Sequence, residues 1–376
     1  MVQAQDGVGR SGAGMSTDRV IDGLSYPIVI AADAAKTLPP LVAQYRRAVI
    51  VHDRRVTDRA KSIASALATA GVAPADAIAI DAGERTKRLE SAASLYDEFV
   101  ERGTERSTLV VAVGGGTTTD LVGFAAATYM RGLSWAAVPT TVLGMADAAI
   151  GGKTGVDLRA GKNLVGAFWN PIAVVADLRS LETLPDRERR TGLAEAIKCA
   201  IIAEPDLLDR IATMPSDAPP EWWRDVIAEA ARVKAHIVAA DPRESGRRAV
   251  LNLGHTVGHA LETATRYRMA HGEAVAVGIR AAGLMSRTRG DWPLGDHVRV
   301  LNVMRRVGLP VFARAVKADA VMSGITRDKK VVDGRVRFVL PVSIGDVRHG
   351  IEVDTAVALR AIESCTAPPS GAELTG

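Results

Sequence analysis

The stretch STLVVAVGGGTTTD, residues 107–120, joins an apolar run to three consecutive glycines and three threonines. The apolar run predicts a buried strand, and the residues after Gly116 predict a helix. Glycines at such a turn let the backbone approach a ligand, and the first N–H groups of the helix can bind a phosphate. The spacing is not G-x-G-x-x-G. The stretch therefore predicts either a phosphate or dinucleotide site or a simple tight turn.

On both sides of this stretch, short apolar runs alternate with amphipathic segments. Strands are expected at 47–52, 77–80, 107–113, 136–139 and 173–176, and helices at 56–71 and 88–102. Strands that alternate with helices indicate βαβ units and a parallel sheet. From about residue 185 the pattern becomes mostly helical, with segments at 223–240, 251–265 and 272–288. The expected fold class is α/β, an N-terminal parallel-sheet nucleotide-binding domain followed by a mostly α-helical domain.

Composition divides the chain into four parts. Residues 1–18 are rich in Gly and Ser and are expected to form a flexible leader, and residues 366–376 a flexible tail. The α/β domain is expected at 19–183 and the helical domain at 184–365. Pro185 stands near this boundary, where a helix can start.

The overall composition excludes several classes of protein. Hydrophobic residues make up 47% of the 376 residues and charged residues 24%, which is typical of a globular chain. Two cysteines exclude a disulfide framework and a cysteine zinc site. The absence of an apolar signal segment and of an apolar run of about 18 residues favours the cytoplasm. The net charge of +4 is spread along the chain, which favours a small anionic substrate over nucleic acid.

Two lysines stand in glycine-rich stretches, expected to be loops, that follow the motif VPTT at 138–141. Lys153 lies in GGKTG (151–155) and Lys162 in GKN (161–163). Asp147 occupies the place of the first glycine of a P-loop, which argues against a nucleoside triphosphatase. The two lysines indicate a site for a polyanion, or else are solvated loop residues.

Histidines and glutamates form the other candidate site. His255 and His259 share one helix face, and His271 follows in the sequence AHGE. Together with a carboxylate, such histidines suit a divalent metal, most often zinc. Spacing alone does not choose among Glu195, Glu262 and Glu273, and the paired histidines could instead be packed or capping residues. Three other features favour structural roles. Glu195 and Lys198 have the spacing of a surface ion pair on a helix. The DKK stretch (328–330), with Arg335 and Arg337 nearby, is typical of a solvated turn, and Trp222–Trp223 are expected to be packing residues.

Taken together, these stretches resemble the 3-dehydroquinate synthase family of sugar-phosphate cyclases. The resemblance covers about residues 25–355. The matching stretches, in the family's order, are GGGTTTDLVGFAAATYMRG, VPTTVLGMADAAIGGKTGVD, GKNLVGAFWNP, TLPDRERRTGLAEAIK, LNLGHTVGHALE, HGEAVAVG and DKKVVDGRVRFVLP.

The resemblance implies roles for individual residues. The implied metal ligands, for zinc or cobalt, are Glu195, His255 and His271. The implied NAD contacts are Asp53, Glu84, Lys87, Gly115, Gly116, Asp120, Thr140, Thr141, Lys162, Thr183, Leu184 and Glu188. The implied substrate contacts are Asp147, Lys153, Asn163, Lys198, Lys234, Arg248, Asn252, His259 and Lys330. The family also places an arginine, here Arg131, in the active site of the neighbouring subunit, which implies a homodimer.

The implied reaction converts 3-deoxy-D-arabino-heptulosonate 7-phosphate to 3-dehydroquinate and phosphate. It proceeds by transient oxidation with NAD, β-elimination of phosphate, re-reduction and intramolecular aldol closure. Related alternatives are an aminodehydroquinate synthase and a valiolone-type cyclitol synthase that acts on sedoheptulose 7-phosphate. Lys234, Arg248 and Asn252, which would hold the substrate carboxylate, favour the first activity. More distant alternatives are a metal-dependent polyol dehydrogenase and a non-catalytic protein on the same scaffold.

Three departures from the family pattern stand out. Thr117–Thr119 replace other small residues, a change that should preserve NAD binding. Cys199 is expected to be a packing residue. Pro242, just before the Arg248 region, could shift a loop and alter the choice of substrate.

Overall fold

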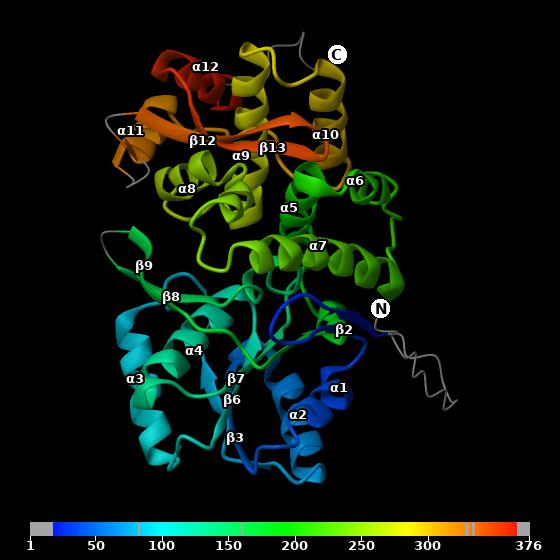
Figure 1. The fold of residues 1–376 in the computed structure, drawn as a ribbon, viewed down its shortest axis with the longest axis vertical. Helices are drawn as coiled ribbons and strands as arrows, with labels where there is room; N and C mark the ends of the chain where they lie inside the picture. The colour runs from blue at the N-terminus through cyan, green and yellow to red at the C-terminus, as the bar shows by residue number, and fades with distance from the viewer. Residues whose placement is uncertain (1–17, 82, 159–160, 328–330, 333–334, 367–376) are drawn as a thin grey trace, which may run out of the picture.

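The computed structural model describes residues 18–81, 83–158, 161–327, 331–332 and 335–366. The sequence-based leader and tail lie outside these residues except for Asp18 and Thr366. Figure 1 shows the molecule as two stacked layers, with the N-terminal part of the chain below and the C-terminal part above. Among the described residues, no helix combines the length and apolar character needed to cross a membrane.

The lower layer is built on an eight-stranded sheet. Its strands are β1 (Arg19–Ile21), β2 (Ile28–Ala31), β3 (Arg47–Asp53), β4 (Ala73–Pro74), β5 (Ile78–Ile80), β6 (Leu109–Gly114), β7 (Trp135–Pro139) and β10 (Ala173–Asp177). Their order is β1-β2-β10-β7-β6-β3-β4, and β5 also pairs with β3. All pairings are parallel except the antiparallel pair β1–β2. The α/β class with a parallel sheet is confirmed.

Alternate residues of the strands pack against opposite faces of this sheet. The covering helices are α1 (Ala34–Leu41), α2 (Thr57–Thr69), α3 (Leu89–Glu101) and α4 (Gly116–Thr128). Val111 and Val113 of β6 join the core cluster that contains Leu38 of α1 and Ile63 of α2. Val110 and Ala112 join the cluster with α3 and α4. Period-two alternation in a continuously apolar strand thus buries both faces, as parallel sheets require.

The upper layer is mostly helical, as expected from the sequence. Its helices are α5 (Asp186–Ala203), α6 (Pro205–Ala212), α7 (Pro220–Ala240), α8 (His255–Ala264), α9 (His271–Thr288), α10 (Leu294–Arg306), α11 (Ala318–Arg327) and α12 (Thr355–Thr366). The ring centroids of Trp222 and Trp223 lie 5.0 Å apart in an edge-on pair, in line with a packing role. The segment expected to be one helix at 251–265 is broken: a short 3-10 turn, Arg247–Asn252, precedes Gly254, and α8 begins only at His255.

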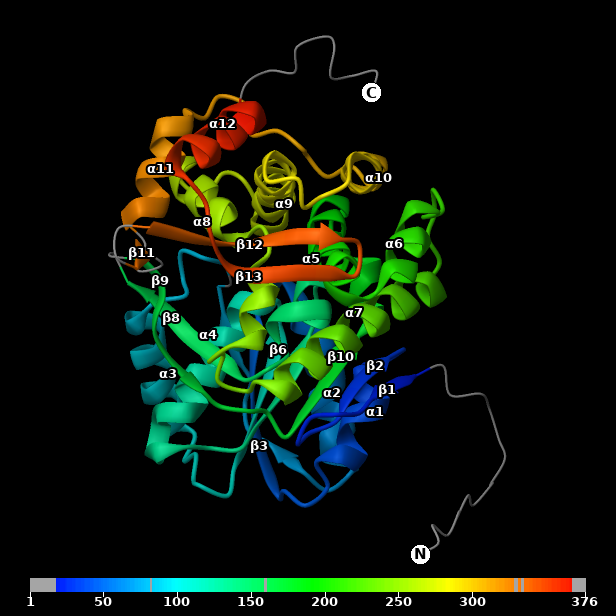
Figure 2. The same ribbon diagram turned by 45° about the horizontal axis from the view of Figure 1, so that its top comes forward.

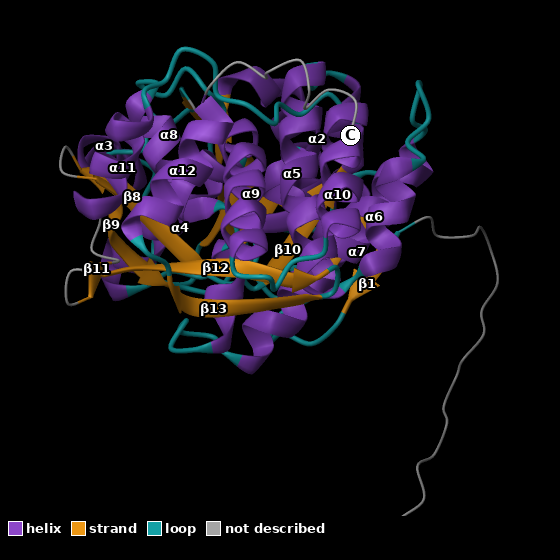
Figure 3. Ribbon diagram, turned by 90° about the horizontal axis from the view of Figure 1, so that it is seen from above, coloured by secondary structure: helices purple, strands orange, loops and turns teal. Residues whose placement is uncertain are grey.

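The upper layer also contains a three-stranded antiparallel sheet that the sequence analysis did not predict. Its strands are β11 (Val331–Val332), β12 (Arg335–Ser343) and β13 (Asp346–Glu352). Val336, Phe338, Val339 and Leu340 of β12 are all buried, so this strand lacks the strict period-two alternation of a half-buried strand. Figure 3 shows that β12 and β13 lie alongside the helices of the upper layer.

A second difference concerns the glycine-rich stretches expected to be loops. They form a hairpin of two antiparallel strands, β8 (Lys153–Leu158) and β9 (Gly161–Phe168). Glycines allow the two backbones to meet: a Cβ on Gly155 would lie 2.8 Å from the carbonyl oxygen of Val165. In Figures 1 and 2 the hairpin rises from the lower layer toward α8. Lys153 and Lys162 are therefore held on strands, rather than on free loops.

Helices α8 and α9 approach each other at a pair of glycines. Gly254 adopts a φ of +78°, a conformation that favours glycine, immediately before α8 begins. A Cβ on Gly278 of α9 would lie 2.0 Å from the carbonyl oxygen of Gly254. The close approach fixes where His255 and His271, the first residues of the two helices, lie relative to each other.

Gly278→Ala should lower the free energy of unfolding by about 1–3 kcal/mol, because the added methyl group overpacks this contact. Urea denaturation followed by circular dichroism measures the change. Gly295→Ala, in the first turn of α10, is the matched control, since its Cβ would meet nothing within 4 Å. The control should be neutral or stabilising by up to about 1 kcal/mol. Equal effects of the two substitutions would contradict this account of the α8–α9 contact.

Candidate active site between the two layers

A cavity of about 560 Å³ lies between the lower and upper layers. Its walls come from α4, the hairpin β8–β9, α5, α7, α8 and α9, so neither layer forms it alone. Most residues singled out in the sequence line it. They are Glu84, Lys87, Gly116, Asp120, Asp147, Lys153, Lys162, Asn163, Lys198, Lys234, Arg248, Asn252, His255, His259 and His271.

Glu195, on α5, is not part of the cavity lining but lies next to both His255 and His271. Its side chain is 0% exposed and that of Lys198, with which it forms an ion pair, is 1% exposed. The surface ion pair expected from the spacing is therefore wrong. Residues 191–202 of α5 are all buried, because neighbouring helices and the lower layer surround this helix. Cys199 is buried among them, which agrees with a packing role.

Three side chains converge in the geometry of a metal site. Glu195 Oε1 lies 3.6 Å from His255 Nε2 and 3.5 Å from His271 Nε2. Ligands about 2.0–2.1 Å from a tetrahedral zinc ion are separated by about 3.3 Å, so the three atoms could surround one ion with little movement. His255 Nδ1 lies 3.1 Å from the carbonyl oxygen of Leu253, an acceptor that would leave Nε2 free to bind the ion.

The electrostatics of the three residues also fit a divalent cation. Among the described residues, neither oxygen of Glu195 has a hydrogen bond of acceptable geometry, although Lys198 forms an ion pair with Oε2. Burial lowers the pKa of His255 to about 4, which favours its neutral, metal-binding form. Burial also opposes protonation of His271, but the adjacent carboxylates of Glu195 and Glu262 outweigh it and raise its pKa to about 10. The site thus attracts positive charge.

The structure distinguishes among the three glutamates that spacing allowed as metal ligands. Glu273 accepts from the backbone N–H of Ala270 and forms an ion pair with Arg187, so it caps α9 instead of facing the histidines. Glu262 lies 3.4 Å from His271 Nδ1. A second cluster, His259–Glu262–His271, also has potential ligand atoms within 4.8 Å of one another, and it shares His271 with the first.

Asp147 joins the lower layer to two buried lysines of the upper layer. Its Oδ1 atom lies 2.9 Å from Lys234 Nζ and 3.4 Å from Lys198 Nζ, and Lys234 also donates to its carbonyl oxygen at 2.6 Å. Burial alone would raise the pKa of Asp147, but the two lysines lower it to about 2. Burial lowers the pKa of Lys234, aided by the charges of Lys198 and Arg248. The arrangement holds two ammonium groups at the cavity wall.

Arg248 and Asn252 form the neighbouring wall. Arg248 is 1% exposed, and its guanidinium donates to the carbonyl oxygens of Pro242 at 2.7 Å and Gly151 at 3.0 Å. Pro242, which departs from the family pattern, therefore helps to hold Arg248. Two of five guanidinium N–H groups are used in this way, which leaves donors for an anionic ligand.

Glu244 is a cavity residue that the sequence analysis missed. Its carboxylate forms an ion pair with Lys153 and accepts a hydrogen bond from Asn252 Nδ2 at 2.7 Å. It thus contacts Lys153 of the predicted polyanion site and Asn252 of the residues expected to hold the substrate carboxylate. No motif marks this position in the sequence. Only the fold brings Glu244, from the segment after α7, beside the hairpin.

The predicted nucleotide-binding site lies at the point where the order of the strands in the sheet reverses. From β3 the chain passes to β4 and β5 on one side and then to β6 on the other. Ligands of open α/β sheets bind at the carboxyl ends of strands at such a point. Asp53 ends β3, and Gly114 ends β6 directly before α4.

The backbone at the start of α4 fits a pyrophosphate. A Cβ on Gly116 would lie 2.8 Å from Ala148, and one on Gly114 would lie 2.5 Å from Thr118 Oγ1. No described side chain caps this helix. Its first N–H groups are thus available to a phosphate group. Nearby, Lys87 Nζ donates to Asp120 Oδ2 at 2.8 Å and to Asn163 Oδ1 at 2.6 Å.

The remaining residues assigned to NAD lie along the same edge of the sheet but outside the cavity lining. They are Asp53, Gly115, Thr140, Thr141, Thr183, Leu184 and Glu188. Asp53 forms an ion pair with Arg55 at 2.6 Å, and this hydrogen bond, aided by the charges of Asp53 and Glu188, raises the pKa of Arg55. Gly115 packs closely on Thr141, since a Cβ on Gly115 would lie 3.1 Å from Thr141 Cγ2.

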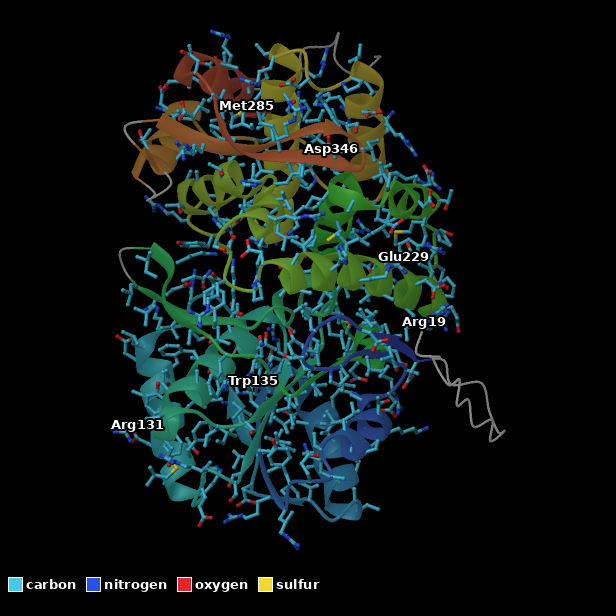
Figure 4. The ribbon with its side chains drawn as sticks, in the orientation of Figure 1. Arg19, Arg131, Trp135, Glu229, Met285 and Asp346 are labelled. Carbon is cyan, nitrogen blue, oxygen red and sulfur yellow. The ribbon has the colours of Figure 1, made fainter. Side chains whose placement is uncertain are left out.

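Arg131, the residue expected to act across a dimer, is also absent from the cavity lining. It lies at the outer edge of the lower layer, as Figure 4 shows, in the short 3-10 turn Tyr129–Arg131 that follows α4. Met130 and Arg131 both have positive φ angles, +50° for Met130 and +65° for Arg131. Lys330 and its neighbours 328–329 lie outside the described residues.

Comparisons with known proteins agree with this geometry. The family model "3-dehydroquinate synthase N-terminal" matches residues 77–191, and "3-dehydroquinate synthase C-terminal" matches residues 192–331. The 3-dehydroquinate synthase of Solibacter usitatus is 43% identical over 304 residues, 80% of this chain and 85% of that protein. The 3-dehydroquinate synthase of Symbiobacterium thermophilum is 42% identical over 332 residues, 86% of this chain and 92% of that protein.

Solved structures share the fold. A 2-epi-5-epi-valiolone synthase from Streptomyces hygroscopicus, with NAD+ and Zn²⁺ bound, matches with a TM-score of 0.82 at 28% identity over 95% of this chain and 99% of that one. A 2-deoxy-scyllo-inosose synthase matches with a TM-score of 0.83 at 24% identity over 93% of this chain and 100% of that one. From the family models and the relatives above 40% identity, the chain belongs to the 3-dehydroquinate synthase family.

Proposed function

We propose that this protein is a 3-dehydroquinate synthase, which converts 3-deoxy-D-arabino-heptulosonate 7-phosphate to 3-dehydroquinate and phosphate. The observation that carries the proposal is a buried set of cations at one wall of the cavity. Arg248, Lys234 and Lys198 are each less than a tenth exposed, and all three line the cavity. Cations kept out of water in this way can bind an anionic substrate strongly, because bulk solvent screens the interaction little and charge-assisted hydrogen bonds are strong.

The proposed cofactors are NAD and one divalent metal ion, zinc or cobalt. The glycine turn before α4 and the carboxyl edge of the sheet would hold NAD, which supplies a hydride acceptor that is regenerated within the cycle. Glu195, His255 and His271 would hold the metal ion, which supplies Lewis-acid polarisation of a substrate hydroxyl. Support comes from the start of α4, which suits a pyrophosphate, and from the spacing of the Glu195–His255–His271 cluster, which suits a metal ion. The valiolone synthase structure with NAD+ and Zn²⁺ bound adds further support.

The substrate phosphate is assigned to Lys153 and Asn163 on the hairpin, with His259 on the opposite wall. The backbone N–H of Asn163 donates to Asp157 Oδ1 at 2.9 Å, and the side-chain Oδ1 of Asn163 accepts from Lys87 Nζ at 2.6 Å, which orients the side-chain amide. Lys153 is now paired with Glu244, and a phosphate would compete for the same ammonium group. Lys330 is proposed as a further phosphate ligand. Elimination then leaves the phosphate in a basic pocket that stabilises its charge.

The substrate carboxylate is assigned to Arg248, Lys234 and Asn252. A guanidinium presents paired donors that match a carboxylate, and the carbonyls of Pro242 and Gly151 orient it in advance. Asp147 and Lys198 are placed next to the metal cluster. The ionised Asp147 carboxylate accepts hydrogen bonds from substrate hydroxyls, while the Lys198 ammonium stabilises negative charge that develops on oxygen.

The cyclitol synthases are the nearest alternative activity. A solved structure of that type is 28% identical to this chain, whereas the 3-dehydroquinate synthases of Solibacter usitatus and Symbiobacterium thermophilum are 43% and 42% identical. Sedoheptulose 7-phosphate has no carboxylate, so it would make no ion pair with Arg248 or Lys234. The presence of both cations favours the carboxylated substrate.

A homodimer completes the proposed site. Arg131 lies on the outer face of the lower layer and not in the cavity of its own chain. Met130, next to it, is a 44% exposed apolar side chain that contact with a second copy would cover. We propose that this face meets a second copy and that Arg131 binds the substrate phosphate of the partner.

The division into an NAD-binding domain, 19–183, and a metal- and substrate-binding domain, 184–365, also remains a proposal. It is supported by the end of the last sheet strand, β10, at Asp177 and the start of α5 at Asp186. A cytoplasmic location is proposed from the cysteine count of two, which suits a reducing compartment.

Purified protein with NAD and Zn²⁺ should release orthophosphate from 3-deoxy-D-arabino-heptulosonate 7-phosphate without net formation of NADH. Sedoheptulose 7-phosphate should be rejected by a factor of about 10⁴ in kcat/KM, because it lacks the carboxylate that Arg248 and Lys234 would bind. A phosphate-release assay with both substrates, together with absorbance at the NADH wavelength, measures this. Release from sedoheptulose 7-phosphate alone would contradict the proposal and favour a cyclitol synthase.

Subunit complementation tests the role of Arg131. Arg131→Ala and Lys198→Ala homodimers should both be nearly inactive, whereas a 1:1 mixture after subunit exchange should recover about one quarter of wild-type activity. Half of the chains then lie in mixed dimers, each with one intact site. A mixture of Lys153→Ala and Lys198→Ala is the control and should recover nothing, since both changes are in the same chain's site. No recovery in the first mixture would contradict a role across the interface.

A further inference from the structure

Glu262 lies between the metal cluster and the hairpin of the lower layer. Its side chain is 4% exposed, although it is a carboxylate. The two oxygens have different partners: Oε1 accepts from Lys162 Nζ at 3.0 Å, and Oε2 lies 3.4 Å from His271 Nδ1. A buried carboxylate that is shared between a lysine and an imidazole holds both in place.

The contact with Glu262 determines which nitrogen of His271 faces the metal cluster. When Nδ1 donates its proton to Glu262, Nε2 carries the lone pair, and Nε2 lies 3.5 Å from Glu195 Oε1. His255 shows the same pattern, with Nδ1 next to the carbonyl oxygen of Leu253 and Nε2 toward Glu195. Partners of this kind orient metal-bound histidines and strengthen their binding.

Lys162 connects Glu262 to the lower layer. It lies on β9, and its ammonium group also forms an ion pair with Glu84 at 2.6 Å. The ammonium lies 4.8 Å from the centre of the Tyr267 ring, just beyond the end of α8. Its side chain is 18% exposed, so these contacts are largely shielded from solvent. Lys162 therefore ties the hairpin to α8 beside the cavity.

We propose that Glu262 is a positioning residue that fixes the His271 imidazole for metal binding, and that Lys162 holds Glu262 in place from the hairpin. This inference rests on the proposed metal site of Glu195, His255 and His271. On this account the affinity for the metal depends on Lys162 of the lower layer, which is adjacent in sequence to Asn163 of the proposed phosphate site. Neither spacing nor the resemblance assigned such a role to Glu262.

The test is a Co²⁺ titration of the metal-depleted full chain, read by competition with a chelator and by the d–d absorption band of the bound ion. Glu262→Gln should weaken Co²⁺ binding by about 10- to 100-fold, because an amide has one oxygen and cannot serve both partners. The d–d band should persist, since the three ligands remain. Lys162→Met should cause a smaller loss.

The double variant distinguishes a linked chain of contacts from two separate effects. If Lys162 acts through Glu262, Lys162→Met should cause no further loss of Co²⁺ affinity in the Glu262→Gln background. Glu273→Gln is the matched control, a glutamate two residues from His271 that contacts Arg187 instead, and it should leave the affinity unchanged. Glu195→Gln removes a proposed ligand and should abolish the d–d band.

Three results would overturn the positioning role. Unchanged affinity of Glu262→Gln would show that the contact is immaterial, and loss of the d–d band would show that Glu262 is itself a ligand. An equal effect of Lys162→Met in both backgrounds would show that Lys162 does not act through Glu262. A wild-type chain that bound no Co²⁺ would instead overturn the proposed metal site, and the positioning role with it.

Discussion

The organisation of this molecule depends on a carboxylate buried where no water can reach it. Glu195 is fully buried and faces two imidazole nitrogens and one ammonium group. A buried charge is costly unless other charges compensate it, so Lys198, His255 and His271 must all be held close to it. Both histidines are the first residues of their helices, α8 and α9, and the close approach of these helices at Gly254 and Gly278 holds them near Glu195. A divalent cation would complete the compensation.

The second constraint is that the site exists only where the two layers meet. Asp147 of the lower layer accepts from Lys234 and Lys198 of the upper layer, and Lys162 of the hairpin donates to Glu262. These ion pairs cross the boundary at the cavity wall. The parallel sheet supplies a crevice for a nucleotide, and the helices supply buried cations for an anionic substrate. The proposed chemistry requires both on the same substrate molecule, which accounts for a cavity between layers.

Much of the fold could be predicted because its signals are local. The strand, glycine turn and helix at 107–128 follow from apolar runs and glycines, and the order of strands and helices follows from their alternation. The burial of the Glu195–Lys198 pair could not be predicted from spacing, because it depends on which helices surround α5. Glu244 lies in no recognisable motif, and it contacts Lys153 only because the fold places the segment after α7 beside the hairpin. The choice between Glu262 and Glu273 likewise required knowing that Glu273 caps α9.

The position of the metal ion tests the central claim most directly. Crystals of the protein grown with Zn²⁺ would be measured by anomalous diffraction at the zinc absorption edge. The account predicts one peak within about 2.0–2.2 Å of a Glu195 oxygen and of Nε2 of both His255 and His271. A peak among His259, Glu262 and His271 instead, or no peak near Glu195, would contradict it.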